Sequence, residues 1–172
     1  MSKQVAVAWP AHYEDARIYI WGFGVYASGT AALAICKPHI VFKLVEPPLY
    51  VADKYLGIAP VHPPVTIEEF RANAFAWAFV FAIGGIYLVF GGPFWNRGGK
   101  MLLEAGLFTR LIYVVTVYAL CFFTEYGTNL AFVVATSDLL SVLLTKRALK
   151  ASWVDLIFGR KVKQVPVGNS SR

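Results

Sequence analysis

The sequence predicts an all-α polytopic membrane protein built as a bundle of four transmembrane helices. Hydrophobic residues make up 58% of its 172 residues and charged residues only 15%, whereas soluble domains average about 45–50% and about 25%. The apolar residues also gather in long blocks, and a membrane-spanning helix needs about 20 mostly apolar residues in succession. We therefore expect a single transmembrane domain over residues 1–172, with no separate soluble domain.

The first two predicted spans, residues 18–36 and 72–92, contain no charged residue. Both carry small side chains at separations of three, four and seven residues, a pattern that lets helix backbones approach closely in lipid. These are Gly22, Gly24, Ser28 and Gly29 in the first span, and Ala74, Ala78, Ala82 and Gly85 in the second. The pattern predicts that the two helices use these faces on each other or on the rest of the bundle.

The long connection between these spans, residues 37–71, is too apolar for a solvated spacer. It predicts a loop that folds onto the membrane surface and caps one end of the bundle. Prolines are expected to exclude a long helix here, because proline lacks an N–H and clashes with the preceding turn; these are Pro47, Pro48, Pro60, Pro63 and Pro64. Thr66 followed by Glu69 fits a capping box that starts the second helix.

The third and fourth predicted spans, residues 107–126 and 128–145, meet at a tight turn around Gly127, and each contains an internal charge. Arg110 lies in the third span and Asp138 near the middle of the fourth, where a charge costs about 2.5–3.5 kcal/mol on insertion scales. Counted from the turn at about 1.5 Å per residue, their depths differ by only roughly 6 Å. We expect Arg110 to be the counter-ion of Asp138.

Two interpretations of this pair stay open. In the favoured one it fixes the register of the third and fourth helices; in the other, Arg110 and Asp138 line a polar cavity, with Asp138 as general acid or base. Glu125, at the membrane boundary under the capping loop, is a second candidate catalytic acid. Tyrosines inside the spans are candidate ligand-binding residues, because a hydroxyl in lipid needs a partner; these are Tyr26, Tyr87, Tyr113 and Tyr118.

Basic residues concentrate in residues 146–172 after the fourth span. Because cytoplasmic segments are enriched in Lys and Arg, we expect both termini in the cytoplasm and residues 146–172 to form a basic cytoplasmic tail. The membrane would be the endoplasmic reticulum in a eukaryote or the inner membrane in a bacterium. Four tail residues fall on one helical face and predict a short C-terminal interfacial helix; these are Leu149, Trp153, Leu156 and Ile157.

The remaining chemistry that composition suggests is limited. The net charge of +6 is explained by the membrane topology, so we expect no nucleic-acid partner. The three histidines and two cysteines have none of the spacings typical of metal or haem sites, so we expect no metal and no cofactor.

Four short motifs follow one another along residues 18–145: GVYASGTAALAICKP, FRANAFAWAFVFAIGGIYLVFG, GLFTRL and SDLLSVL. A Gly-rich first span, an arginine before a Gly-rich second span, a Thr-Arg in the third and an aspartate in the fourth resemble the DoxX-like group of small membrane proteins. The resemblance implies a four-helix architecture, with Arg71, Arg110 and Asp138 as the positions carried over. It implies little about activity, although some members of the group are linked to quinone-dependent redox systems.

The size, the aromatic-rich helices and the expected cytoplasmic termini also resemble four-span endoplasmic reticulum proteins of sterol or terpenoid biosynthesis. The favoured function is an integral membrane protein that binds a lipophilic ligand or tethers partner enzymes in the bilayer. The alternative is a small membrane-embedded isomerase or cyclase that acts on a terpenoid, sterol or quinone-like substrate by acid/base chemistry. Expected partners are membrane lipids, a lipophilic small molecule, and a membrane enzyme or a second copy of the chain.

Overall fold

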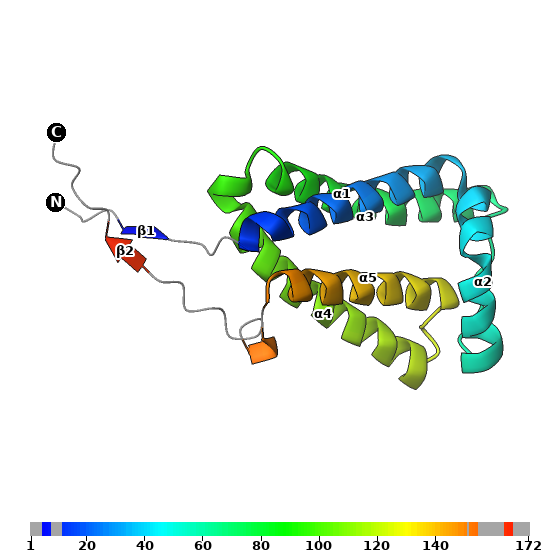
Figure 1. The fold of residues 1–172 in the computed structure, drawn as a ribbon. Helices are drawn as coiled ribbons and strands as arrows, with labels where there is room; N and C mark the ends of the chain where they lie inside the picture. Colours follow the sequence, from blue (N-terminus) through cyan, green and yellow to red (C-terminus); the bar gives the residue numbers. More distant parts are fainter. Residues whose placement is uncertain (1–4, 8–11, 151, 155–163, 167–172) are drawn as a thin grey trace.

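The computed structural model describes residues 5–7, 12–150, 152–154 and 164–166, most of which lie in helices (Figure 1). The elements are α1 (His12–Cys36), α2 (Pro38–Leu56), α3 (Ile67–Gly91), a π-helical turn η1 (Trp95–Gly99), α4 (Lys100–Phe123) and α5 (Asn129–Ala148). Two three-residue strands, β1 (Val5–Val7) and β2 (Gln164–Pro166), pair antiparallel. The helices α1, α3, α4 and α5 are long and apolar enough to cross a membrane, which confirms the predicted four-helix membrane bundle.

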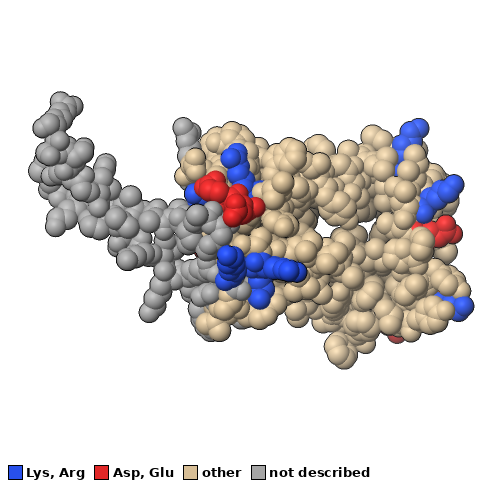
Figure 2. All heavy atoms as spheres, in the orientation of Figure 1, with Lys and Arg blue, Asp and Glu red and all other residues tan. Residues whose placement is uncertain are grey.

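The outer surface of the bundle is that of a membrane-embedded protein. Figure 2 shows charged side chains at the two ends of the molecule and a broad uncharged surface between them. Large apolar side chains point outward along the spans; in α3, Phe75 is 82% exposed and Phe79 is 68% exposed. Soluble proteins rarely expose large contiguous apolar patches, so this surface is suited to lipid.

The four spans form two pairs, α1 with α3 and α4 with α5, and contacts between α1 and α5 join the pairs (Figure 1). α1 begins and α5 ends at the same end of the bundle, which we call the terminal end. α2 lies across the opposite end, where it contacts both α1 and α5. The connection between the first two spans therefore caps the bundle as predicted.

The prediction that prolines exclude a long helix from this connection is wrong, because α2 runs for 19 residues with Pro47 and Pro48 inside it. Both prolines lie on an exposed side of the helix, as do Lys43 and Leu44, whose carbonyls lose their usual helical partners. The opposite side of α2 is buried against the bundle. Packing of that face outweighs the local cost of the prolines. The helix ends at Gly57, which adopts a left-handed conformation with φ of 66°.

The interface between α1 and α3 is closed by glycines. A Cβ at Gly24 would lie 2.9 Å from the carbonyl oxygen of Gly84, and one at Gly84 would lie 2.7 Å from the backbone nitrogen of Ser28. Gly24 and Ser28 were among the small residues predicted to pack. Gly85, also predicted, has nothing within 4 Å of its Cβ position, so the neighbouring Gly84 takes its place in the interface.

The helix starts follow the sequence signals. Thr66 caps α3 by accepting a hydrogen bond from Glu69 N at 3.2 Å, while the Glu69 carboxylate accepts one from Thr66 N at 3.0 Å, which confirms the predicted capping box. Thr128 caps α5 in the same way through Ala131 N, at 3.2 Å. α3 therefore begins five residues before the predicted span and α5 one residue after it, and both starts are set by the caps and not by hydropathy.

The predicted interfacial helix of the C-terminal tail falls largely outside the described residues, because residues 151 and 155–163 are not described. Of its four residues, Leu149 belongs to the buried core at the terminal end, with 1% of its surface exposed. Trp153 is exposed, and the Lys146 ammonium lies 4.6 Å from its ring centroid. Leu149 therefore packs inside the bundle, whereas the prediction placed it on a membrane surface.

Candidate functional site

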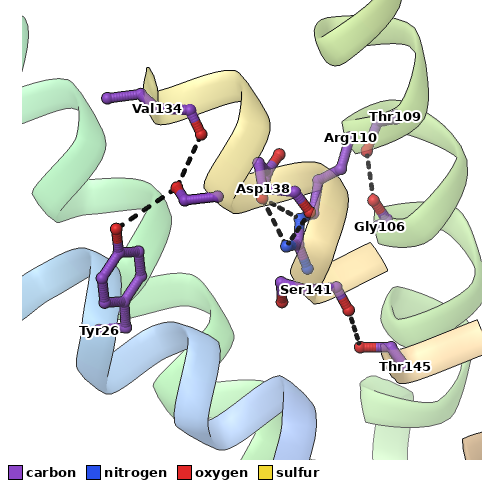
Figure 3. Close-up of polar contacts among 9 residues, drawn as sticks. Tyr26, Gly106, Thr109, Arg110, Val134, Asp138, Ser141 and Thr145 are labelled. Atoms are coloured by element: carbon purple, nitrogen blue, oxygen red, sulfur yellow. Dashed lines mark hydrogen bonds and ion pairs between the residues drawn. The ribbon is translucent and has the colours of Figure 1, made fainter. Parts of the chain in front are cut away.

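The predicted pairing of Arg110 with Asp138 is present in the structure. Arg110 Nε donates to Asp138 Oδ1 at 2.7 Å, and its Nη2 lies 2.5 Å from the same oxygen and 3.3 Å from the Asp138 backbone carbonyl oxygen (Figure 3). The side chains of both residues are 10% exposed. The pair links the middle of α4 to the middle of α5, which is the register the sequence predicted.

The arginine has a further partner that the sequence did not reveal. Its guanidinium carbon lies 3.7 Å from the ring centroid of Phe23 in α1, a distance at which a cation and an aromatic face attract each other. The Phe23 ring in turn meets Tyr87 of α3 edge to face, with centroids 4.8 Å apart. Arg110, Asp138, Phe23 and Tyr87 thus form one cluster, the central cluster, with a residue from each of the four spans.

The central cluster is suited to holding the helices together. A buried charge pair is costly to form, yet removing one partner costs about 3–5 kcal/mol because the other charge is left uncompensated. The Nε and Nη2 atoms of Arg110 both contact Oδ1 of the Asp138 carboxylate. These contacts tie the carboxylate of α5 to the guanidinium of α4. The arrangement favours the structural interpretation of the pair.

Glu125, the second candidate acid, is not brought to this cluster. It is exposed in the connection between α4 and α5, whereas Asp138 follows the first residue of α5 by nine positions, about 14 Å along the helix. The expected partial burial of Glu125 under the capping segment is not observed. Of the three candidate catalytic residues, Arg110 and Asp138 therefore form an ion pair inside the bundle, whereas Glu125 lies at its edge.

The four candidate tyrosines also divide. Tyr87 is buried in the central cluster, and Tyr113 is exposed on α4. The Tyr118 hydroxyl lies 3.0 Å from the Thr136 hydroxyl, and its ring stacks on Phe132 with centroids 5.2 Å apart. Tyr26 reaches from α1 to the Ser137 hydroxyl at 3.4 Å, and Figure 3 shows its ring pointing toward α5. Tyr26 and Tyr118 thus approach the same helix, α5, from different sides.

An apolar groove of about 660 Å³ lies between α2 and α5. Its walls are Pro48, Val51 and Ala52 of α2 and the face of α5 from Phe132 to Leu143. Two hydroxyls lie in the α5 wall, those of Thr136 and Ser137. Sequence analysis missed this groove because one wall comes from a segment expected to be a loop; the signal available was the run of apolar residues in that segment.

The hydroxyls in the groove wall are already bonded within the protein. Thr136 Oγ1 donates to the Phe132 carbonyl oxygen at 2.8 Å and meets Tyr118, while Ser137 Oγ donates to the Val134 carbonyl oxygen at 2.8 Å and meets Tyr26. Because these groups have partners, the wall presents itself chiefly as a hydrocarbon surface. It is suited to an apolar chain more than to a polar ring system.

A second polar cluster ties the terminal end together. Arg17 of α1 donates to two carbonyls at the C-terminal end of α3, 2.7 and 2.9 Å away. Glu14 forms an ion pair with Lys100 at 2.6 Å and accepts the Trp95 indole N–H at 2.7 Å. The pocket beside Arg17 is smaller, about 370 Å³. This cluster joins α1 to η1 and α4, and its groups are engaged with one another.

Arg71, carried over from the family resemblance, is exposed near the start of α3 and away from the central cluster. Among the described residues, no group of three or more His, Cys, Asp or Glu side chains is arranged to hold a metal ion. No protein-family model, curated protein or solved structure matches the chain.

Proposed function

We propose that the protein is an integral membrane component that binds a lipophilic molecule in the groove between α2 and α5. The observation that carries this proposal is the groove itself: about 660 Å³ of open, almost entirely apolar space whose lining residues on α2 and α5 are all uncharged. Pockets of about 300–1,000 Å³ accommodate small ligands. Its position at the side of the bundle gives a ligand access from the bilayer.

Binding is favoured over acid/base catalysis by the contacts of the charged residues. Asp138 is held by Arg110 on the α4 side of α5, and no described carboxylate lines the groove. An isomerase or cyclase needs a positioned acid or base within reach of its substrate. A lipophilic molecule with an apolar chain is accordingly proposed as a ligand of the groove and not as a substrate.

The test is photolabelling of purified protein in lipid nanodiscs with a diazirine-bearing isoprenoid alcohol, with labelled residues mapped by mass spectrometry. We expect labelling of the α5 wall between Phe132 and Leu143 that an excess of unlabelled alcohol competes away. Leu140→Trp, which places an indole in the groove, should abolish this saturable labelling. The matched control is Ile112→Trp on the exposed face of α4, which should leave it unchanged.

The result that would overturn the proposal is labelling of α5 that neither competitor nor Leu140→Trp reduces. Such labelling would equal that of any lipid-facing helix. Support for the proposal requires labelling that saturates, that unlabelled alcohol competes away and that Leu140→Trp reduces. A helix that is merely exposed to lipid would also be labelled, but a competitor would not displace the label from it.

We also propose that the terminal end faces the cytoplasm. The support is the excess of Lys and Arg in the segments at that end, which is typical of cytoplasmic loops. A C-terminal epitope tag on sealed vesicles of known orientation checks this: protease added from the cytoplasmic side should remove the tag. Protection of the tag until detergent is added would place the terminal end on the other side.

A further inference from the structure

The pocket beside Arg17 at the terminal end differs from the groove because charged and apolar residues line it together. It measures about 370 Å³ and lies where α1 begins and α3 ends. Its lining residues are Glu14, Arg17, Ile18 and Trp21 of α1, with Gly91 and Gly92 at the end of α3. One acid, one base and two large apolar side chains therefore share a single pocket.

The four lining residues of α1 lie on one face of the helix, at positions i, i+3, i+4 and i+7. The charged pair is nearer the terminal end, and Ile18 and Trp21, which are 69% and 50% exposed, lie deeper. Glu14 and Trp21 are about 10 Å apart along the helix, whereas the headgroup layer on each side of a bilayer is about 5–8 Å thick. The face therefore runs from the headgroups to the acyl chains, and an indole at that boundary is typical of membrane proteins.

Arg17 is fixed in this pocket with hydrogen-bond donors to spare. Its Nε donates to the Gly91 carbonyl oxygen at 2.7 Å and its Nη2 to that of Gly92 at 2.9 Å. A guanidinium has five N–H donors, and within the part of the chain that the structure describes no group accepts from Nη1. A guanidinium oriented by two backbone carbonyls is suited to binding a phosphate.

Glu14 brings the opposite charge to the same pocket. One carboxylate oxygen pairs with the Lys100 ammonium at 2.6 Å, the other accepts the Trp95 indole N–H at 2.7 Å, and the side chain is 53% exposed. Because a carboxylate has about four lone-pair sites, it can accept further donors from the exposed side. Figure 2 shows acidic and basic side chains adjoining at the terminal end.

This combination favours a zwitterionic headgroup over an anionic one. A headgroup that carries only a phosphate is attracted by Arg17 and repelled by Glu14, whereas one that also carries an ammonium is attracted by both. Residues three apart on a helix have Cβ atoms about 5–6 Å apart, a separation that suits a phosphate and an ammonium joined by two carbons. A primary ammonium also donates hydrogen bonds to a carboxylate, which the quaternary ammonium of choline cannot do.

We infer that the terminal-end pocket binds phosphatidylethanolamine from the adjacent leaflet, with the phosphate at Arg17 and the ammonium at Glu14. The acyl chains lie beside Ile18 and Trp21, which continue the same face of α1 into the bilayer. The site is at the opposite end of the bundle from α2, so the inference does not depend on ligand binding in the groove.

Native mass spectrometry tests the inference on protein released from nanodiscs with equal amounts of phosphatidylethanolamine, phosphatidylcholine and phosphatidylglycerol, all with identical acyl chains. We expect the wild type to retain phosphatidylethanolamine about fivefold more than either other lipid, since an exposed ion pair contributes up to about 1 kcal/mol. An excess of soluble glycerophosphoethanolamine should not displace it, because that molecule lacks the chains that contact the apolar part of the pocket.

Two variants should shift the retention in opposite directions. Glu14→Gln should lose the preference over phosphatidylcholine and gain phosphatidylglycerol, because Arg17 then has no Glu14 carboxylate beside it. Arg17→Gln should retain phosphatidylglycerol least of the three. The matched controls are Glu125→Gln and Arg71→Gln, an exposed acid and an exposed base away from the pocket, which should keep the wild-type ratios. A loss of packing alone would not reverse the headgroup preference between the two variants.

Equal retention of phosphatidylethanolamine and phosphatidylcholine by the wild type overturns the inference, as does a wild-type preference for phosphatidylglycerol. An unchanged preference in Glu14→Gln overturns the contact of the ammonium with that carboxylate. Displacement by glycerophosphoethanolamine overturns the lipid as the ligand. If Arg17→Gln does not fold, the three lipids on the wild type and on Glu14→Gln still decide between these outcomes.

Discussion

The interface between α1 and α3 and the groove between α2 and α5 are two solutions to packing helices in lipid. Along α1–α3, glycines let backbones touch, and a methyl group at Gly84 would have no room. Along α2–α5, large side chains and a helix crossing at the bundle end leave about 660 Å³ open. In lipid, apolar side chains gain little from leaving the bilayer for a protein interface, so association depends on close packing and polar contacts.

The difference indicates where the molecule holds its shape and where it can admit a ligand. Close contacts and the central cluster lie among α1, α3, α4 and the side of α5 that carries Asp138. The opposite side of α5, with Leu140 and Leu143, makes few such contacts and is exposed. Substitutions in the first region should therefore change stability, and substitutions in the second should change binding.

The largest expected effect on stability comes from Asp138→Leu. It removes one partner of the buried pair and leaves the Arg110 charge uncompensated, which should cost about 3–5 kcal/mol of the free energy of unfolding. Thermal denaturation of the purified protein in detergent measures the loss. Adding Arg110→Met to Asp138→Leu should restore most of it, because the orphaned charge is then absent.

Glu125→Gln is the control for this prediction, since it also neutralises an acid but at an exposed position. We expect its midpoint temperature to match that of the wild type. An Asp138→Leu variant as stable as Glu125→Gln would contradict the structural interpretation of the pair and return Asp138 to the list of candidate catalytic residues.

A smaller loss is expected from Gly84→Ala in the closed interface. The added methyl would meet the backbone of Ser28 at 2.7 Å, and overpacking of this kind costs about 1–3 kcal/mol. Gly85→Ala is a matched control at the next residue of the same helix, where nothing lies within 4 Å of the Cβ position. Equal stability of the two variants would show that α1 and α3 are not in close backbone contact.

Hydropathy and internal charge were sufficient to predict the four spans and the Arg110–Asp138 pair. Both signals are local: a span needs length and apolar composition, and a tight turn between two helices converts sequence distance into depth. The choice of Gly84 over Gly85 was not predictable, because it depends on how far α3 is rotated about its axis against α1. A one-residue error corresponds to about 100° of rotation.

The groove, and the contacts of Phe23 and Tyr87 in the central cluster, could not be predicted from the sequence for a different reason. Phe23 meets Arg110 only because α1 packs on α5, and no charge or turn in the sequence links those two helices. The sequence predicted a loop in place of α2 because the average destabilisation of a helix interior by proline was applied to Pro47 and Pro48. On an exposed side at the end of the bundle, carbonyls released by proline can be solvated, and the buried face of α2 decides the conformation.

The smallest expected effect tests whether the groove wall belongs to the open region. Tyr118→Phe and Thr136→Val each remove the hydrogen bond between these two hydroxyls, 3.0 Å apart, and such bonds contribute about 0.6 kcal/mol on average in membrane helices. A double-mutant cycle in detergent should give a coupling of that size in the free energy of unfolding. Thr116→Val, at an exposed threonine of α4, is the control for loss of a hydroxyl alone. A coupling above about 2 kcal/mol would exceed what these bonds supply and would mean that the wall is part of the closed core. The open character of the groove depends on that wall being held only weakly.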